Sequence, residues 1–170
     1  MEKEINMEIR RSTNADLSVI LELYAHAREF MRSHGNPEQW GSTYPPQELV
    51  EADIHSGCSY VCVEQGRIVG TFYYSTEPES DYEKINDGKW LNDAPYGVVH
   101  RITSDGTVKG TASYCLDWAL QQCGNLKIDT HRDNTVMQHT LSRNGFQYCG
   151  IVFIKDGSER LAYQKHMPKK

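Results

Sequence analysis

The order of strand-like and helix-like segments predicts an α/β (α+β) fold, with a mixed, twisted sheet of six to seven strands and about four helices on its faces. Two observations carry this prediction. Two pairs of strand-like segments flank short turns, QGR at 65–67 and KDGSE at 155–159, and such turns are typical of hairpins. Two further strands, at 96–104 and 126–131, each precede a helical pattern. The predicted order is β-α-α-β-β-loop-β-α-β-α-β-β.

The N-terminal third predicts one strand and two helices. Residues 7–13 alternate apolar and polar side chains and predict a strand, after which Thr13 and Asp16 have the spacing of a helix cap. A short second helix is expected over 47–57. The first helix should end near Gly35 and Pro37, and its apolar face contains Leu17, Ile20, Leu21, Tyr24, Ala27 and Met31.

The middle of the chain predicts a hairpin followed by a long loop. Segments 58–64 and 68–75 are the hairpin strands. Residues 76–95 are polar and rich in turn formers, but they include large apolar side chains. We therefore expect an ordered, functional loop, with Tyr82, Ile85, Trp90 and Leu91 as its anchors.

The C-terminal half predicts two helices and three more strands after the strand at 96–104. The helix capped by Asn134 should end at Gly145, and strands at 146–154 and 160–167 complete the sheet. The helix before it should end at Gly124, and one face contains Thr111, Cys115, Trp118, Ala119 and Gln122.

Composition narrows the class of protein. A length of 170 residues predicts one domain over 1–170. The net charge of -5 argues against nucleic-acid binding, and five cysteines without a CxxC pair argue against a disulfide framework and a thiolate zinc site. Without an apolar leader or a membrane-length segment, we expect a cytoplasmic protein with no membrane partner.

The turn SDGTVKGTASYC at 104–115 is a candidate anion site. Small residues between a strand and a helix aim backbone N–H groups at one point, where the helix dipole favours negative charge. Gly106 and Gly110 permit unusual backbone angles, and Lys109 can contact a phosphate. The spacing excludes a Walker loop and the dinucleotide GxGxxG motif. An ordinary β–α turn is the alternative.

This turn resembles motif A of the GNAT superfamily of acetyl-CoA-dependent N-acetyltransferases, with Thr107, Gly110 and Ala112 at its first, fourth and sixth positions. Threonine departs from the Gln or Arg usual at the first position. The segments VVHRITS, LKIDTH with DN after it, and NGFQYCG are similar to further landmarks of the superfamily in the same order. The resemblance implies the GNAT fold, acetyl-CoA as acyl donor and no metal.

The resemblance also implies roles for individual residues. Asn134 would contact pantetheine, with a simple helix cap as the alternative, and Arg143 would lie near the nucleotide unless it is only a solvated surface residue. The backbone of Ile102, Thr103 and Ser104 would pair with the pantetheine arm. The diphosphate would be held by the turn residues Thr107, Val108, Lys109, Gly110, Thr111, Ala112 and Ser113.

Acetyl transfer requires a neutral amine, a stabilised oxyanion and a proton for the leaving thiolate. The resemblance implies an oxyanion donor beside Ile102. It also implies an acid at the position of Leu141, where the family commonly has tyrosine. His100 and His131 are therefore the candidate catalytic proton relays, with packing roles as the alternative. Asp129 would orient a histidine or bind a cationic substrate, with hydrogen bonds to backbone groups at the strand end as the alternative.

The acceptor is predicted to be a small-molecule or peptide amine. Trp40, Tyr82 and Trp90 supply candidate aromatic walls, with loop anchoring as the alternative. Glu38, Asp81 and Asp87 supply negative charge, whereas Tyr24, Cys115 and Cys149 are expected in the core. The sequence is compatible with both a monomer and a homodimer. The competing hypothesis is an acyl-CoA-binding module or sensor with weak or no catalysis.

Overall fold

The computed structural model describes residues 6–168 and contains one mixed seven-stranded sheet, which confirms the predicted fold class. The strand order is β1-β2-β3-β4-β5-β7-β6, and only the β4–β5 pair is parallel among these strands. The strands are β1 Met7–Arg11, β2 Ser59–Glu64, β3 Arg67–Ser75, β4 Gly97–Ser104, β5 Asn125–Thr130, β6 Gln147–Phe153 and β7 Glu159–His166.

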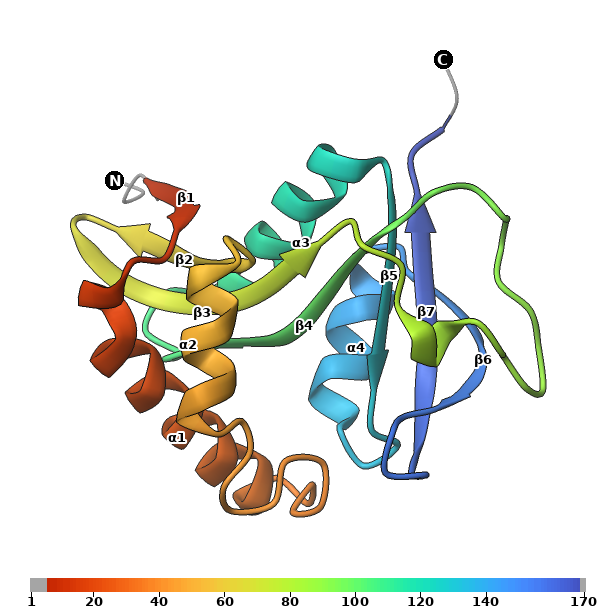
Figure 1. Ribbon diagram of the computed structural model, residues 1–170, viewed down its shortest axis with the longest axis horizontal. Coiled ribbons are helices and arrows are strands. Elements are labelled where there is room, and N and C mark those ends of the chain that lie inside the picture. The colour runs from red at the N-terminus through yellow and green to blue at the C-terminus, as the bar shows by residue number, and fades with distance from the viewer. Residues whose placement is uncertain (1–5, 169–170) are drawn as a thin grey trace.

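Four α-helices cover the two faces of this sheet (Figure 1). The first two lie on one face, because Val61 and Val63 of β2 pack against Ile20 and Val50. None of the described helices is long and apolar enough to span a membrane. The helices are α1 Leu17–Ser33, α2 Gln47–His55, α3 Thr111–Cys123 and α4 Thr135–Arg143, with short 3-10 turns η1 Asn14–Asp16 and η2 Ser80–Tyr82.

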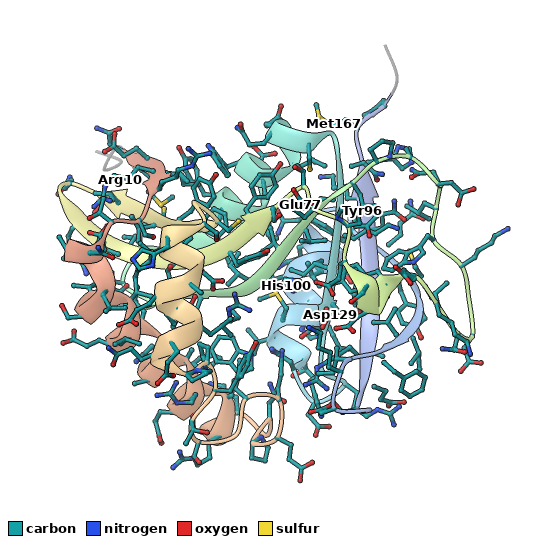
Figure 2. All side chains as sticks on the ribbon, viewed as in Figure 1. Arg10, Glu77, Tyr96, His100, Asp129 and Met167 are labelled. Carbon is teal, nitrogen blue, oxygen red and sulfur yellow. The ribbon has the colours of Figure 1, made fainter. Side chains whose placement is uncertain are left out.

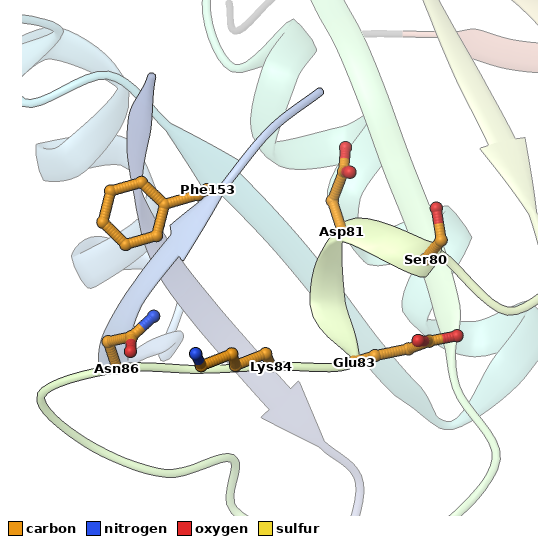
Figure 3. A pocket seen from close by; sticks show the side chains of 6 residues that line it. All are labelled: Ser80, Asp81, Glu83, Lys84, Asn86 and Phe153. Carbon is orange, nitrogen blue, oxygen red and sulfur yellow. The ribbon is translucent and has the colours of Figure 1, made fainter. Parts of the chain in front are cut away.

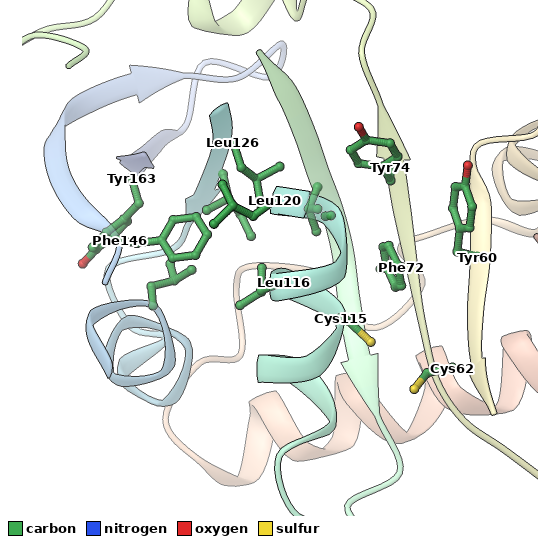
Figure 4. Packing of buried hydrophobic residues seen from close by; sticks show 14 of the residues in the cluster. Tyr60, Cys62, Phe72, Tyr74, Cys115, Leu116, Leu120, Leu126, Phe146 and Tyr163 are labelled. Carbon is green, nitrogen blue, oxygen red and sulfur yellow. The ribbon is translucent and has the colours of Figure 1, made fainter. Parts of the chain in front are cut away.

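The largest apolar core lies on the opposite face, under α3 (Figure 4). Successive side chains of a strand point to opposite faces, so Cys62 of β2 joins this core while its neighbour Val61 joins the other. Leu116 and Leu120 of α3 meet Phe72 and Leu126 there. Because of this alternation, β2 contributes side chains to both cores.

Several element boundaries differ from the sequence prediction. The first strand ends at Arg11, because Thr13 turns into the cap and donates its backbone N–H to Asp16 at 2.8 Å. In α1 the predicted face omits Leu23, which is buried. In α3 the predicted Gln122 is exposed, because Leu116 and Leu120 turn the buried face away from it.

The loop between β3 and β4 is ordered, as predicted. Asn86 and Ile151 of β6 exchange two backbone hydrogen bonds of 2.8 Å. Gly88 packs so closely on β6 that a Cβ atom would lie 1.9 Å from the Cys149 carbonyl oxygen, so only glycine fits this approach. Leu91 N–H also donates to Gln164 of β7 at 2.8 Å, so the loop is fixed along β6 and over β7.

Candidate active site

β4 and β5 diverge soon after they begin to pair. Their parallel pairing is limited to Gly97 with Leu126 and Val98 with Lys127, although both strands continue (Figure 1). From Val99 to Ser104, β4 pairs with β3 alone. Its other edge therefore offers backbone N–H and C=O groups to a ligand that can bind as an added strand.

A β-bulge interrupts β4 at this opening. The β3–β4 register shifts between Thr71 and Tyr73, and Arg101 has a φ of +52°. A bulge re-aims backbone groups, and a non-glycine residue in this region costs about 1–3 kcal/mol. The strain falls at the residue before Ile102, beside which an oxyanion donor is expected.

Buried contacts fix the Arg101 side chain. Its guanidinium forms an ion pair with Asp53 of α2, donates to the Tyr44 hydroxyl at 3.3 Å and lies over the Tyr73 ring at 5.0 Å. Burial lowers the pKa of Arg101, but the Asp53 carboxylate outweighs it and the net pKa is raised. The bulge is thereby tied to α2.

The β4–α3 turn has the backbone geometry of an anion cradle. Gly106 and Gly110 have φ of +78° and +85°, and a Cβ added to either would meet nothing within 4 Å. The first backbone hydrogen bond of α3 runs from Tyr114 N–H to the Gly110 carbonyl at 2.9 Å. The N–H groups of residues 111–113 precede it and lack intrahelical acceptors, so they can bind an anion.

A side chain from β3 supports this turn. Arg67 donates to Asp105 at 2.8 Å and to the Thr107 hydroxyl at 2.7 Å, while Thr107 N–H donates to Asp105 at 2.9 Å. Partial burial raises the pKa of Asp105, but hydrogen bonds from Thr107 and Arg67 hold it below its usual value. Arg67 thus brings a guanidinium beside the threonine that departs from the motif.

Beside the opening, β4 and the β3–β4 loop bring a histidine and a carboxylate together. His100 Nε2 lies 3.1 Å from Glu79 Oε2, and Glu79 also accepts the Asp81 N–H at 3.2 Å. The hydrogen bond from His100 lowers the pKa of Glu79 against partial burial. The carboxylate is therefore ionised at neutral pH and orients the imidazole.

A second pair lies beside the first. The buried Tyr82 donates its hydroxyl to Asp129 of β5 at 2.6 Å, and its ring centroid is 6.2 Å from that of His100. Figure 2 shows His100 and Asp129 close together on the neighbouring strands. Burial raises the pKa of Tyr82 well above its usual value, so the phenol stays protonated. We call Glu79, Tyr82, His100 and Asp129 the acidic cluster.

A solved structure of a protein of known family is similar to this protein over nearly its whole length. A Streptococcus agalactiae structure described as a GNAT family acetyltransferase is 32% identical, with 96% of each chain covered and a TM-score of 0.87. The chain belongs to the GNAT family of acetyltransferases. No protein-family description and no curated protein matches it.

More distant GNAT-like structures agree with this chain in fold. The ribosomal-protein-alanine N-acetyltransferase of Brucella melitensis is 20% identical, with 94% of this chain and 99% of that chain covered and a TM-score of 0.63. A Salmonella typhimurium protein solved with its cofactor acetyl-CoA is 16% identical, with 97% and 96% covered and a TM-score of 0.64.

In this GNAT chain the predicted cofactor residues fall into two groups. The residues from Ile102 to Ser113 surround the strand opening and the turn, and Lys109 is exposed there. Asn134 caps α4 by accepting the Met137 N–H at 3.0 Å, and its amide donates to Gln39 at 3.0 Å. Arg143 is exposed near the end of α4, where it donates to Thr140 at 3.4 Å.

His131 lies one residue beyond β5, which corrects its predicted position on that strand. Its Nδ1 accepts the Asp133 backbone N–H at 3.0 Å. Burial lowers the pKa of His131, and the Arg160 guanidinium lowers it further. The ring is neutral at pH 7 and carries its proton on Nε2, so its lone pair is already used.

The predicted aromatic residues have different environments. Trp40 is buried beside the core residue Tyr24, with ring centroids 5.6 Å apart. Trp90 donates its indole N–H to the Tyr82 carbonyl at 3.0 Å and covers Lys127, whose Nζ lies 4.1 Å from its ring. Both therefore anchor loops, and Trp90 does so directly against the acidic cluster.

Three other positions lie inside the protein. Leu141, at the usual tyrosine position, is fully buried in the α3 core. Cys115 and Cys149 are buried too, and burial raises the pKa of the Cys149 thiol. None of these side chains is presented to the strand opening as an acid or nucleophile in this conformation.

Sequence reasoning missed Glu79 and Arg101 as site residues. Glu79 lies in a loop with five other acidic residues between 76 and 95, and nothing local distinguishes it. Arg101 has a positive φ although it is not a glycine, the residue type by which such a conformation is usually predicted. An open pocket of about 240 Å³ lies beside η2 and β6, and no residue of the acidic cluster lines it (Figure 3). It is lined by Ser80, Asp81, Glu83, Lys84, Asn86 and Phe153.

Proposed function

We propose that this protein transfers the acetyl group of acetyl-CoA to a primary amine of a small molecule or peptide. The amine would attack directly in a ternary complex, without an acyl-enzyme. The observation that carries the proposal is the unpaired β4 edge leading into the glycine turn of α3. The acetyl-CoA bound to the Salmonella typhimurium protein of similar fold supports it.

The residues present fit this acyl donor. The β4 edge at Ile102, Thr103 and Ser104 can hydrogen-bond an extended amide-containing arm, and the N–H groups at the start of α3 can hold a diphosphate. When bound, acetyl-CoA supplies the thioester carbonyl. The backbone beside Ile102, turned by the bulge at Arg101, is proposed to donate to the oxygen of that carbonyl.

The acidic cluster is proposed to prepare the amine. Asp129 and Glu79 attract the ammonium form of the acceptor. When His100 donates from Nε2 to Glu79, its Nδ1 is left as the base that takes a proton from the amine. The same imidazolium then holds a proton for the thiolate, a role that the buried Leu141 cannot perform.

A catalytically weak acyl-CoA-binding module is the second candidate function. The full burial of Leu141 at the position of the usual tyrosine acid favours it. On this reading the same strand opening and turn bind acyl-CoA, and the protein responds to the ligand without turning it over.

One experiment separates the two candidates. Calorimetry with acetyl-CoA tests binding, and release of the CoA thiol is then followed with a panel of primary amines. Binding with amine-dependent thiol release supports the transferase. Binding without release on any amine supports the module, and failure to bind acetyl-CoA contradicts both.

A further inference from the structure

Arg160 of β7 is a buried cation that forms no ion pair with any described carboxylate. It is 6% exposed, and its guanidinium donates to Ser158 Oγ at 3.1 Å, to the Glu159 carbonyl at 2.9 Å and to the Gln39 carbonyl at 3.3 Å. All three acceptors are neutral oxygens, and no ion pair with Arg160 occurs within residues 6–168. The exposed Asp156 interacts with Arg160 only through the Ser158 hydroxyl, which donates to it, and through a longer-range charge effect. Buried charges are normally paired, so this guanidinium suits an anionic ligand group.

The register of the sheet places Arg160 next to the acidic cluster. Asp129 pairs with Ala162, and Arg160 lies two residues from Ala162 on the same face of β7. The strand rise separates the two positions by roughly 7 Å. Ala162 also packs with Tyr82, so this face is the one over which the acidic cluster lies.

His131 is a neutral donor beside Arg160 in the register of the sheet, because it follows Thr130, which pairs with Leu161. Its Nδ1 accepts the Asp133 N–H, which leaves Nε2–H to donate. Burial and the Arg160 guanidinium lower the pKa of the ring, whereas Asp133 and the exposed Glu38 oppose that shift. A carboxylate near Arg160 would thus meet both a guanidinium and an imidazole N–H.

The loop between α1 and α2 covers this position. Gln39 accepts the Arg160 guanidinium with its carbonyl, and its side-chain oxygen accepts from Asn36 at 2.8 Å and from Asn134 at 3.0 Å. These bonds join the loop to β7 and to the start of α4. A small ligand is therefore favoured here over a long chain.

We infer that the acceptor is a free amino acid or a similar small zwitterion, with its carboxylate on Arg160 and His131 and its amine toward Asp129 and His100. This inference rests on the proposed function. Asp129 and Arg160 lie on one face of neighbouring strands, two residues apart in register, so a molecule with an amine and a carboxylate on one carbon is short enough to contact both. A peptide's N-terminal amine lacks a neighbouring carboxylate, and a diamine would bring a second ammonium against Arg160.

The decisive test uses the unmodified protein. The kcat/KM is measured with acetyl-CoA for each standard amino acid, its amide and its decarboxylated amine. We expect a preference of roughly tenfold or more for the best amino acid over both derivatives. Equal or faster turnover of the amide or the amine overturns the inference and leaves the proposed function standing. Turnover of no amine overturns both.

Variants locate the preference. Arg160→Met removes the charge at similar size, and Arg160→Lys keeps the charge without the planar pair of donors. Both should raise the KM for the amino acid by about tenfold, mainly without a fall in kcat, and bring its ratio to the amide toward unity. Arg32→Gln, at an exposed arginine of α1, is the matched control. An unchanged ratio in Arg160→Met, or an equal rise in the KM for acetyl-CoA, overturns the assignment.

Discussion

His100 Nε2 and Glu79 Oε2 lie 3.1 Å apart although the two residues are 21 positions apart in sequence. One belongs to a central strand and the other to the long loop that crosses it. The contact joins the loop to the point where β4 leaves β5, and it engages Nε2 of the imidazole. The proposed chemistry therefore depends on a loop being held in place.

Replacement of His100 tests this dyad. His100→Asn removes the proposed base while keeping a polar side chain, and kcat should fall by roughly 10²–10⁴. His166→Asn, at an exposed histidine near the end of β7, is the control and should keep full activity. Steady-state thiol release measures both. A His100→Asn enzyme with the activity of the control would remove His100 from the mechanism.

Gly110 provides a test of the anion cradle. Gly110→Val forces a β-branched residue to φ near +85° and puts methyl groups into the turn. Gly157→Val carries the same strain in the β6–β7 turn, where φ is +86° and a Cβ also meets nothing within 4 Å. Both variants should lose similar thermal stability, but only Gly110→Val should weaken acetyl-CoA binding, by about tenfold or more. Calorimetry and melting curves decide, and equal loss of affinity in both variants would indicate a purely structural turn.

The interaction of Asp16 with Arg10 predicts that the free energy of unfolding depends on pH. It accepts two hydrogen bonds from Arg10, at 2.8 and 3.0 Å, and the Arg10 hydrogen bond lowers its pKa although burial opposes the shift. Because the folded pKa lies below the unfolded value near ~3.9, the carboxylate stabilises the fold above that pH and the effect is lost as pH falls through the folded value. Asp16→Asn should cost about 1–3 kcal/mol at pH 7.

Urea unfolding at several pH values measures this cost. The difference between wild type and Asp16→Asn should shrink below about pH 4. Asp117→Asn, at an exposed residue of α3, serves as the control. A cost for Asp16→Asn that stayed constant down to pH 2 would show that the ion pair is not its source.

The contacts of Lys127 predict a measurable energetic coupling between β5 and the β3–β4 loop. It is 5% exposed, with Nζ 4.1 Å from the Trp90 ring and 3.9 Å from the Tyr96 ring, and burial lowers its pKa. A double-mutant cycle of Lys127→Met and Trp90→Leu should give a coupling of about 1–2 kcal/mol. The cycle of Lys127→Met with Trp118→Leu, in the core on the opposite face, should be additive. Additivity in both cycles would contradict a cation–π contact.

Local signals in the sequence were sufficient for much of this fold. The Gln65–Gly66 hairpin turn, the Thr13–Asp16 cap, the Asn134 cap and the positive φ of Gly106 and Gly110 all follow from residues a few positions apart. Their geometry depends on backbone sterics and nearby hydrogen bonds, which short segments encode. The element order, and the resemblance to the GNAT family, could therefore be derived from the sequence by itself.

Tertiary structure alone decided how the candidate site is assembled. The Glu79–His100 contact, the bulge at Arg101, the short β4–β5 pairing and the burial of Arg160 all join segments far apart in the chain. Each depends on strand register and on which loop covers which face. The periodicity and residue types of a segment do not specify its register or its covering loop, because many distant partners are compatible with the same local pattern.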